Sequence, residues 1–162
     1  MADTACHVLH APLQRGLTLV LGHMIQVLRW LAIIPACVAA FYFALFIALY
    51  VRSSVAALCP PELVVSGFCE ASWYPAAEQA VFCFGVALSA FLIVLTAAGI
   101  APTHRVLVSK AALGVGTLIA ILFAVETGEF LALAAAVLAG ILAMLVVTTL
   151  LSRARHASRN VA

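Results

Sequence analysis

Apolar residues dominate four long stretches of the chain, and polar residues are confined to the segments around them. A transmembrane helix needs about 20 mostly apolar residues, because at a rise of about 1.5 Å per residue that length crosses about 30 Å of hydrocarbon. Residues 30–51, 76–98, 106–125 and 130–151 all reach this length. The pattern therefore predicts an all-α membrane protein, in which residues 30–151 form a bundle of four transmembrane helices.

Residues 1–29 show a different pattern, in which apolar and polar positions alternate with helical spacing. Apolar residues recur every three or four positions over 9–28, and Arg15 and Arg29 recur on another face. This spacing is typical of a helix that lies in the head-group plane with its basic face toward anionic lipid. We expect an amphipathic helix here, with Pro12 in its first turn. The alternative is that the same residues extend the first span into the cytoplasm.

The composition supports a membrane setting. Hydrophobic residues make up 67% of the chain and charged residues 9%, and the mean hydropathy is +1.24. A soluble domain carries about 25% charged residues. The net charge of +2 is too small to indicate a nucleic-acid partner. Alanine is abundant and Arg outnumbers Lys, as in bacteria with GC-rich genomes, so we expect a multi-pass protein of a bacterial inner membrane with the lipid bilayer as its surroundings.

Basic residues are concentrated on one side of the predicted spans. Arg52 falls on one side, and all the other Lys and Arg residues fall on the side of the two termini: Arg15, Arg29, Arg105, Lys110, Arg153, Arg155 and Arg159. Cytoplasmic loops carry an excess of Lys and Arg. Both termini are therefore predicted to be cytoplasmic, with residues 152–162 as a basic tail and residues 53–76 as the long outer loop.

The outer loop contains two cysteines, Cys59 and Cys69, with two prolines and a glycine between them. Outside the cytoplasm, paired cysteines become oxidised to disulfides. A crosslink would stabilise a loop that has no core by about 2–3 kcal/mol, because it restricts the unfolded chain. We predict a structural disulfide. Free thiols and a redox-active pair are the alternatives, although the chain has no C-x-x-C motif.

Aromatic residues flank the second span. Trp73 and Tyr74 directly precede it, and Phe68 lies in the outer loop. Trp and Tyr are enriched at membrane–water interfaces, so the simplest role for the pair is to anchor the span at this level. The alternative is that the three aromatic residues form a patch that binds a partner protein.

Acidic residues mark the outer ends of three spans. Glu78, Glu126 and Glu129 lie there, where their carboxylates can reach water. Glu78 and Glu129 also fall in the first turns of their helices, where the helix dipole favours negative charge. We expect solvated helix ends. The alternative is a shared acidic site, since carboxylates close to the membrane commonly mark ion routes.

No other motif indicates chemistry. The middle of each span has no ionisable Asp, Glu, Lys, Arg or His, which argues against a proton-coupled carrier. The histidines all lie outside the spans: His7, His10, His23, His104 and His156. The remaining cysteines are interpreted as packing residues: Cys6, Cys37 and Cys83. We therefore expect no catalytic, cofactor or metal site.

Small residues recur at every fourth position within the spans. In the first span they run from Ala32 to Ala48 and include Ala40 and Ala44, and the other spans carry shorter series: Gly85 and Ser89; Ala112, Gly116, Ala120 and Ala124; Ala132, Ala136 and Gly140. Such spacing lets helix backbones approach closely. It predicts a tight bundle with little interior volume, and we expect Ala40 and Ala44 to form a lateral contact with a partner.

These observations favour a non-enzymatic small membrane subunit that binds, stabilises or regulates a larger membrane protein, or that associates with copies of itself. The alternatives are a membrane immunity protein that neutralises a toxin and a small solute channel or carrier. A thiol or quinone redox enzyme is less favoured, since the spacing of the cysteines lacks its signature motif.

The charge distribution makes a direct prediction about topology. Reporter domains fused after residue 103 and at the C-terminus should report a cytoplasmic location, and a reporter inserted near Gly67 should report an external one. Compartment-specific reporter activity in cells measures this. An external C-terminus would contradict the orientation and would also remove the reason to expect an oxidising environment for Cys59 and Cys69.

Overall fold

A computed structural model of the chain describes the backbone of residues 3–65, 68–101 and 104–159. Side chains are described from residue 24 to residue 153 outside these two gaps, and for His156. Most of the described chain is helical: α1 (Asp3–Ala56), α2 (Tyr74–Ile100), α3 (Arg105–Thr127) and α4 (Phe130–Arg159). Each helix contains a segment long and apolar enough to cross a membrane. The predicted architecture of four long apolar helices is confirmed, and it indicates a multi-pass membrane protein.

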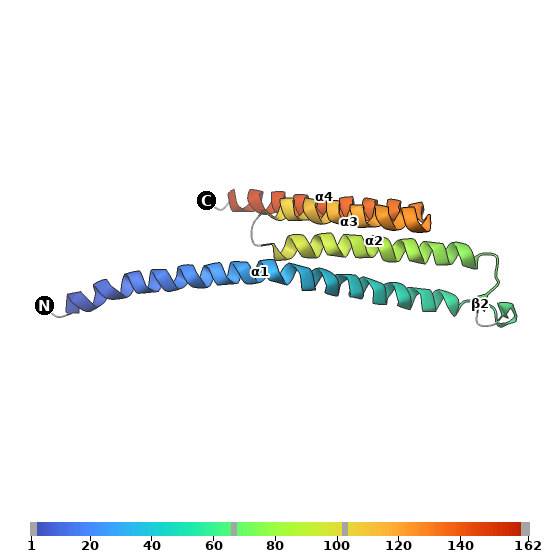
Figure 1. The fold of residues 1–162 in the computed structure, drawn as a ribbon, viewed down its shortest axis with the longest axis horizontal. Helices are drawn as coiled ribbons and strands as arrows, with labels where there is room; N and C mark the ends of the chain where they lie inside the picture. Colours follow the sequence, from blue (N-terminus) through green and yellow to red (C-terminus); the bar gives the residue numbers. More distant parts are fainter. Residues whose placement is uncertain (1–2, 66–67, 102–103, 160–162) are drawn as a thin grey trace.

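The second helix, α2, lies at the centre of the arrangement. It packs against α1 on one side and against α3 and α4 on the other, and α3 and α4 pack on each other (Figure 1). The main contact of α1 within the described chain is with α2. The four helices therefore pack as an α2–α3–α4 group with α1 attached along one side.

The first helix is one continuous helix of 54 residues. At about 1.5 Å per residue it is about 80 Å long, far more than the hydrocarbon thickness requires. Its N-terminal part runs beyond the ends of the other helices, and the helix is bowed (Figure 1). The sequence pattern predicts a separate amphipathic helix over residues 1–29, but the backbone from Asp3 onward extends the first span.

Two further parts of the prediction for residues 1–29 concern Pro12 and the two faces of the helix. Pro12 lies inside α1 and not in a first turn, since the helix begins at Asp3. The side chains of the predicted apolar and basic faces, up to His23, lie outside the residues whose side chains the structure describes. The helical backbone is therefore established here, and the amphipathic character stays a prediction.

The last two helices form a hairpin. Gly128 ends α3 in the left-handed region, with φ +78°, and its N–H donates to the carbonyl of Ala124 at 2.8 Å. Glycine adopts this conformation without the steric cost that a Cβ would add. At the other end, α4 continues to Arg159, so residues 152–159, expected to be a polar tail, extend the helix. That segment contains no Gly or Pro that would end it.

Small residues set the distance between α1 and α2. A Cβ added at Gly85 would lie 2.8 Å from the Cβ of Ala48, closer than real Cβ atoms approach. One turn earlier on the same face of α1, Ala44 is fully buried. This is the close approach of backbones that the spacing of small residues predicts.

The α3–α4 contact uses small residues in the same way. A Cβ at Gly140 would lie 2.5 Å from a methyl carbon of Leu113. Ala124 of α3 and both Ala132 and Ala136 of α4 are buried. The alanines and glycines therefore face neighbouring helices in both interfaces, while large apolar side chains point outward, as a lipid environment allows.

The loop between α1 and α2 is folded around the disulfide. Cys59 and Cys69 are bonded, which confirms the predicted crosslink. Between them, a short 3₁₀ helix (Pro61–Leu63) leads into a two-stranded antiparallel ladder, in which β1 (Val64–Val65) pairs with β2 (Phe68–Cys69). The sequence does not predict these strands, because two residues are too few to show an alternating pattern.

The α1–α2 interface generates a prediction about stability. Replacing Gly85 by Ala should lower the free energy of unfolding by about 1–3 kcal/mol, because the new methyl group overlaps Ala48. Gly114→Ala is the matched control, since no atom lies within 4 Å of a Cβ at that position. Unfolding of both variants in mixed detergent micelles measures the difference. Equal stability of the two variants would contradict the close contact.

Candidate functional site

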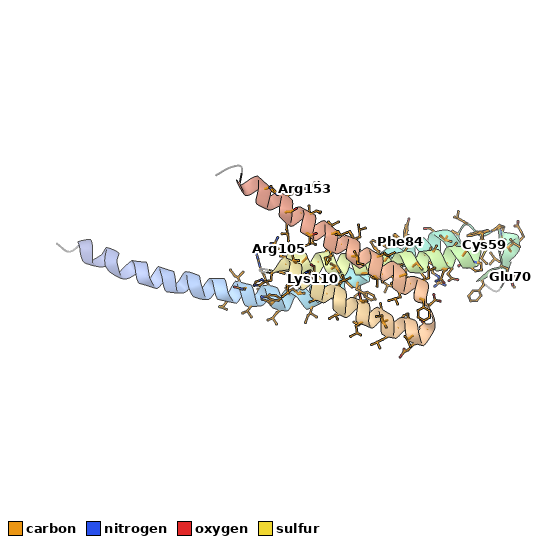
Figure 2. The ribbon with its side chains drawn as sticks, turned by 90° about the horizontal axis from the view of Figure 1, so that it is seen from above. Cys59, Glu70, Phe84, Arg105, Lys110 and Arg153 are labelled. Carbon is orange, nitrogen blue, oxygen red and sulfur yellow. A yellow bond between two sulfur atoms is a disulfide. The ribbon has the colours of Figure 1, made fainter. Side chains whose placement is uncertain are left out.

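Charged groups are separated along the long axis of the molecule. Arg105, Lys110 and Arg153 gather toward one end of the α2–α3–α4 group, and Cys59 and Glu70 lie at the opposite end (Figure 2). The basic groups thus share an end in space as well as in the sequence pattern. An ion pair and a side-chain hydrogen bond lie toward the opposite end, near the disulfide.

Two polar contacts join the helices near the disulfide end. Arg52 of α1 forms an ion pair with Glu78 of α2. Both side chains are substantially exposed, so the pair stabilises the fold by at most about 1 kcal/mol. Gln79 donates from Nε2 to Oε2 of Glu129, just before α4, at 2.8 Å. Neighbouring positions on α2 therefore contact different parts of the chain, α1 and the α3–α4 turn, since successive residues point about 100° apart.

These contacts argue against a shared acidic site. Glu78 is paired with Arg52, and Glu129 accepts a hydrogen bond from Gln79. Glu126 is exposed at the end of α3, and its side chain has no hydrogen bond to another residue in the described part of the chain. The three carboxylates that the sequence suggests as a cluster thus have three different surroundings.

The aromatic residues near the outer loop are partly grouped. Trp73 and Tyr74 contact edge to face, with ring centroids 5.9 Å apart. Phe68 projects from β2 and is 74% exposed. The Trp73–Tyr74 pair sits at the start of α2, as an anchor at the membrane interface would. A role for the three residues in partner binding stays a prediction.

The two alanines expected to contact a partner have different positions. Ala44 is fully buried where α1 packs on α2, so it is used within the chain and is inaccessible to another protein. Its assignment as a partner contact is therefore wrong. The spacing of small residues correctly indicates a helix contact, but the neighbouring helix belongs to the same chain. Ala40 is half-buried at the same interface, and its contact with a partner stays a prediction.

A half-open cavity of about 560 Å³ lies between α2, α3 and α4, and Phe41 of α1 also lines it. It extends along α3 from Ala112 to Ala124 and along α4 from Glu129 to Gly140, which corresponds to about 16–18 Å at 1.5 Å per residue. The sequence predicts little interior volume, and this expectation is wrong. The small residues bring α3 close to α4 at Gly140, whereas Gly116 lines the cavity and a Cβ added there would meet no atom within 4 Å.

The cavity lining is almost entirely apolar. Ser89 is one of its few polar residues, and its hydroxyl already donates to the carbonyl of Gly85 at 2.8 Å. Glu129 lines the end of the cavity nearest the α3–α4 turn, and Phe82 and Phe123 line it as well. An apolar chamber with one carboxylate at its end can bind a ligand, but it offers no nucleophile and base arranged for catalysis.

The described residues do not indicate a metal site or a reactive thiol pair. Among them, no group of three or more His, Cys, Asp or Glu side chains is close enough together to hold a metal ion. Cys37 and Cys83 are free and half-buried. Cys6, which precedes the described side chains, lies outside these observations.

The disulfide can be tested by alkylation. In the native protein without reductant, Cys59 and Cys69 should stay unlabelled, and reduction should expose both, while Cys37 and Cys83 supply the free thiols for comparison. Peptide mass spectrometry measures the labelling at each site. A Cys59→Ser/Cys69→Ser variant should lose about 2–3 kcal/mol of stability. Labelling of both cysteines before reduction would show that the crosslink is absent in the cell.

Comparison with known proteins gives no relative: no family model, no curated protein and no solved structure matches this chain. Its function is therefore inferred from its own contacts, exposed faces and cavity.

Proposed function

We propose that the chain is a non-enzymatic membrane subunit that binds a larger membrane protein through the outward face of α1. This face is defined by Val38, Tyr42, Phe46 and Leu49, which recur every three or four residues. All four side chains are exposed, at 48%, 53%, 69% and 49%. They point away from the stripe around Ala44 that packs on α2. In the proposed orientation both termini and the basic end of the molecule are cytoplasmic, in a bacterial inner membrane.

The exposure of this face does not by itself show whether a partner protein or lipid covers it, because lipid tails cover an apolar face equally well. Phe46 and Leu49 would be stable in either environment. The discriminating group has to be polar, deep in the membrane and on this face. Tyr42 meets all three conditions, and it is the observation that carries the proposal.

The hydroxyl of Tyr42 lies far from both membrane surfaces. Tyr42 follows Arg29 by thirteen residues and precedes Arg52 by ten. These separations correspond to about 20 Å and about 15 Å along the helix, more than the phenol can span. Its hydroxyl makes no hydrogen bond to another residue in the described part of the chain, and its ring packs edge to face on Phe41 at 5.7 Å.

An unpaired hydroxyl in hydrocarbon costs free energy that a hydrogen bond would recover. The hydroxyl can donate this hydrogen bond to an acceptor on a transmembrane helix of another protein, if that helix packs against the outward face of α1. Polar side chains commonly join helices in this way inside membranes, and each such bond contributes about 0.6–2 kcal/mol. The apolar neighbours Val38 and Phe46 supply the surrounding packing.

The length of α1 is consistent with the same role. Its N-terminal part runs beyond the other helices, so it can extend a lateral contact out of the membrane into the cytoplasm (Figure 1). A membrane immunity protein would need a partner-binding face of the same kind, with the toxin or its target as the partner. No observation on the described residues favours that narrower role.

The proposal is tested by photo-crosslinking in native membranes. A photoreactive phenylalanine analogue at Tyr42 should give a protein adduct of discrete mass. The same analogue at Leu122 of α3, which is 61% exposed, should give lipid adducts. Tyr42→Phe should weaken co-purification of the crosslinked protein about 3- to 30-fold, because it removes one hydrogen bond and keeps the ring. Tyr50→Phe, eight residues nearer the outer end, should have no effect. Lipid adducts at both positions would overturn the proposal.

A further inference from the structure

We propose that the cavity between α2, α3 and α4 binds a single-chain cationic amphiphile, with its ammonium group at Glu129 and its apolar chain directed toward Gly140. This inference goes beyond the proposed partner contact and does not rest on it, because none of the four residues that define the outward face of α1 lines the cavity. It rests on the shape of the cavity, on the charge at its end and on the side chains around that charge.

The shape matches an elongated apolar ligand. The cavity has a volume of about 560 Å³ and extends over about three helical turns, from the α3–α4 turn toward the middle of the helices. This volume is within the range of sites that hold drug-sized ligands. Figure 2 shows α3 diverging from α2 toward the α3–α4 turn, the same end at which Glu129 lines the cavity. An amphiphile can therefore place its head at the outer end and its chain in the apolar interior.

The charge at the outer end favours a cation. Glu129 is half-buried, and its described polar side-chain contact is the hydrogen bond from Gln79, a neutral donor. The ion pair found among the described residues involves a different carboxylate, Glu78. The negative charge of Glu129 thus faces a largely apolar chamber without a cation from the described chain. The N-terminus of α4 offsets part of this charge, but a partial dipole does not replace a full positive charge.

The surrounding side chains fit an ammonium group. Gln79 donates to Oε2 of Glu129, and no hydrogen bond to Oε1 is found among the described residues. Phe82, one turn after Gln79, and Phe123, in the last turns of α3, both line the cavity. Aromatic faces attract organic cations, and together with a carboxylate they form the usual recognition site for an ammonium group. A fatty acid would instead be repelled, because its carboxylate would face Glu129.

The chain offers matched variants for each part of the site. Glu129→Gln removes the charge and keeps an acceptor for Gln79, and Glu126→Gln removes a nearby exposed carboxylate that does not line the cavity. Gly116→Leu fills the cavity from a position where a Cβ meets no atom within 4 Å. Gly114→Leu makes the same change on the same helix away from the cavity, and a Cβ there also meets no atom within 4 Å.

The experiment measures saturable binding of radiolabelled dodecyltrimethylammonium to the full-length protein in phosphatidylcholine nanodiscs, with empty nanodiscs as the blank. We expect one site per chain. Binding should weaken at least about tenfold in Glu129→Gln, which loses a charged contact, and in Gly116→Leu. It should be retained in Glu126→Gln and Gly114→Leu. Dodecyl sulfate and a neutral dodecyl glycoside, which share the chain and differ in the head group, should not compete.

The following binding results would overturn the proposal. Equal binding by Glu129→Gln and the wild-type protein, or equal competition by the neutral glycoside, would show that the cavity holds apolar chains without discriminating charge. Displacement of the probe by phosphatidylethanolamine in the nanodiscs would overturn the single-chain assignment in favour of a membrane lipid. If Gly116→Leu fails to fold, as size-exclusion chromatography would show, Glu129→Gln decides alone. Loss of the crosslink at Tyr42 would leave this result unchanged.

Discussion

The contact between Gly85 and Ala48 holds α1 to the rest of the molecule. A Cβ at Gly85 would lie 2.8 Å from that of Ala48, so the two backbones are as close as side chains permit. Because α1 packs mainly on α2, this interface and the loop between the two helices carry most of its attachment within the described chain. Apolar burial contributes little in lipid, and close packing of backbones takes its place. The disulfide and the Arg52–Glu78 pair then hold the same two helices at the end where they are joined by the loop.

Placing α1 along one side of α2 has two structural consequences. The large side chains on the outward face of α1, including Tyr42, stay exposed. The other three helices form most of the wall of the cavity, and Phe41 of α1 completes the lining. Close approach of α3 to α4 at Gly140 and the open position at Gly116 arise from the same residue types. Small residues therefore produce a tight interface on one side of α3 and a cavity on the other.

The sequence predicted the parts of this structure that depend on local pattern. Runs of apolar residues long enough to span a membrane identified the four helices, and Cys59 and Cys69 identified the crosslink. Spacing of small residues showed that helices approach closely, but it does not say which helices meet. For that reason the spacing points Ala44 toward an outside partner, although the residue packs on α2. The cavity was missed for the same reason, because empty space depends on how three helices diverge. No local signal in the sequence distinguished Gly116, which faces open space, from Gly85, which does not.

Glu129 illustrates how tertiary structure changes the meaning of a residue. In the sequence it cannot be distinguished from Glu78 and Glu126, because all three are acidic residues at helix ends. In the folded chain Glu78 is neutralised by Arg52, and Glu126 is exposed. Glu129 alone among the three lines an apolar cavity, held in place by a neutral amide. A carboxylate that reaches water needs no partner, whereas one that faces an apolar chamber gains from a cation. The chemical difference between three identical side chains is thus set by which helix each one faces.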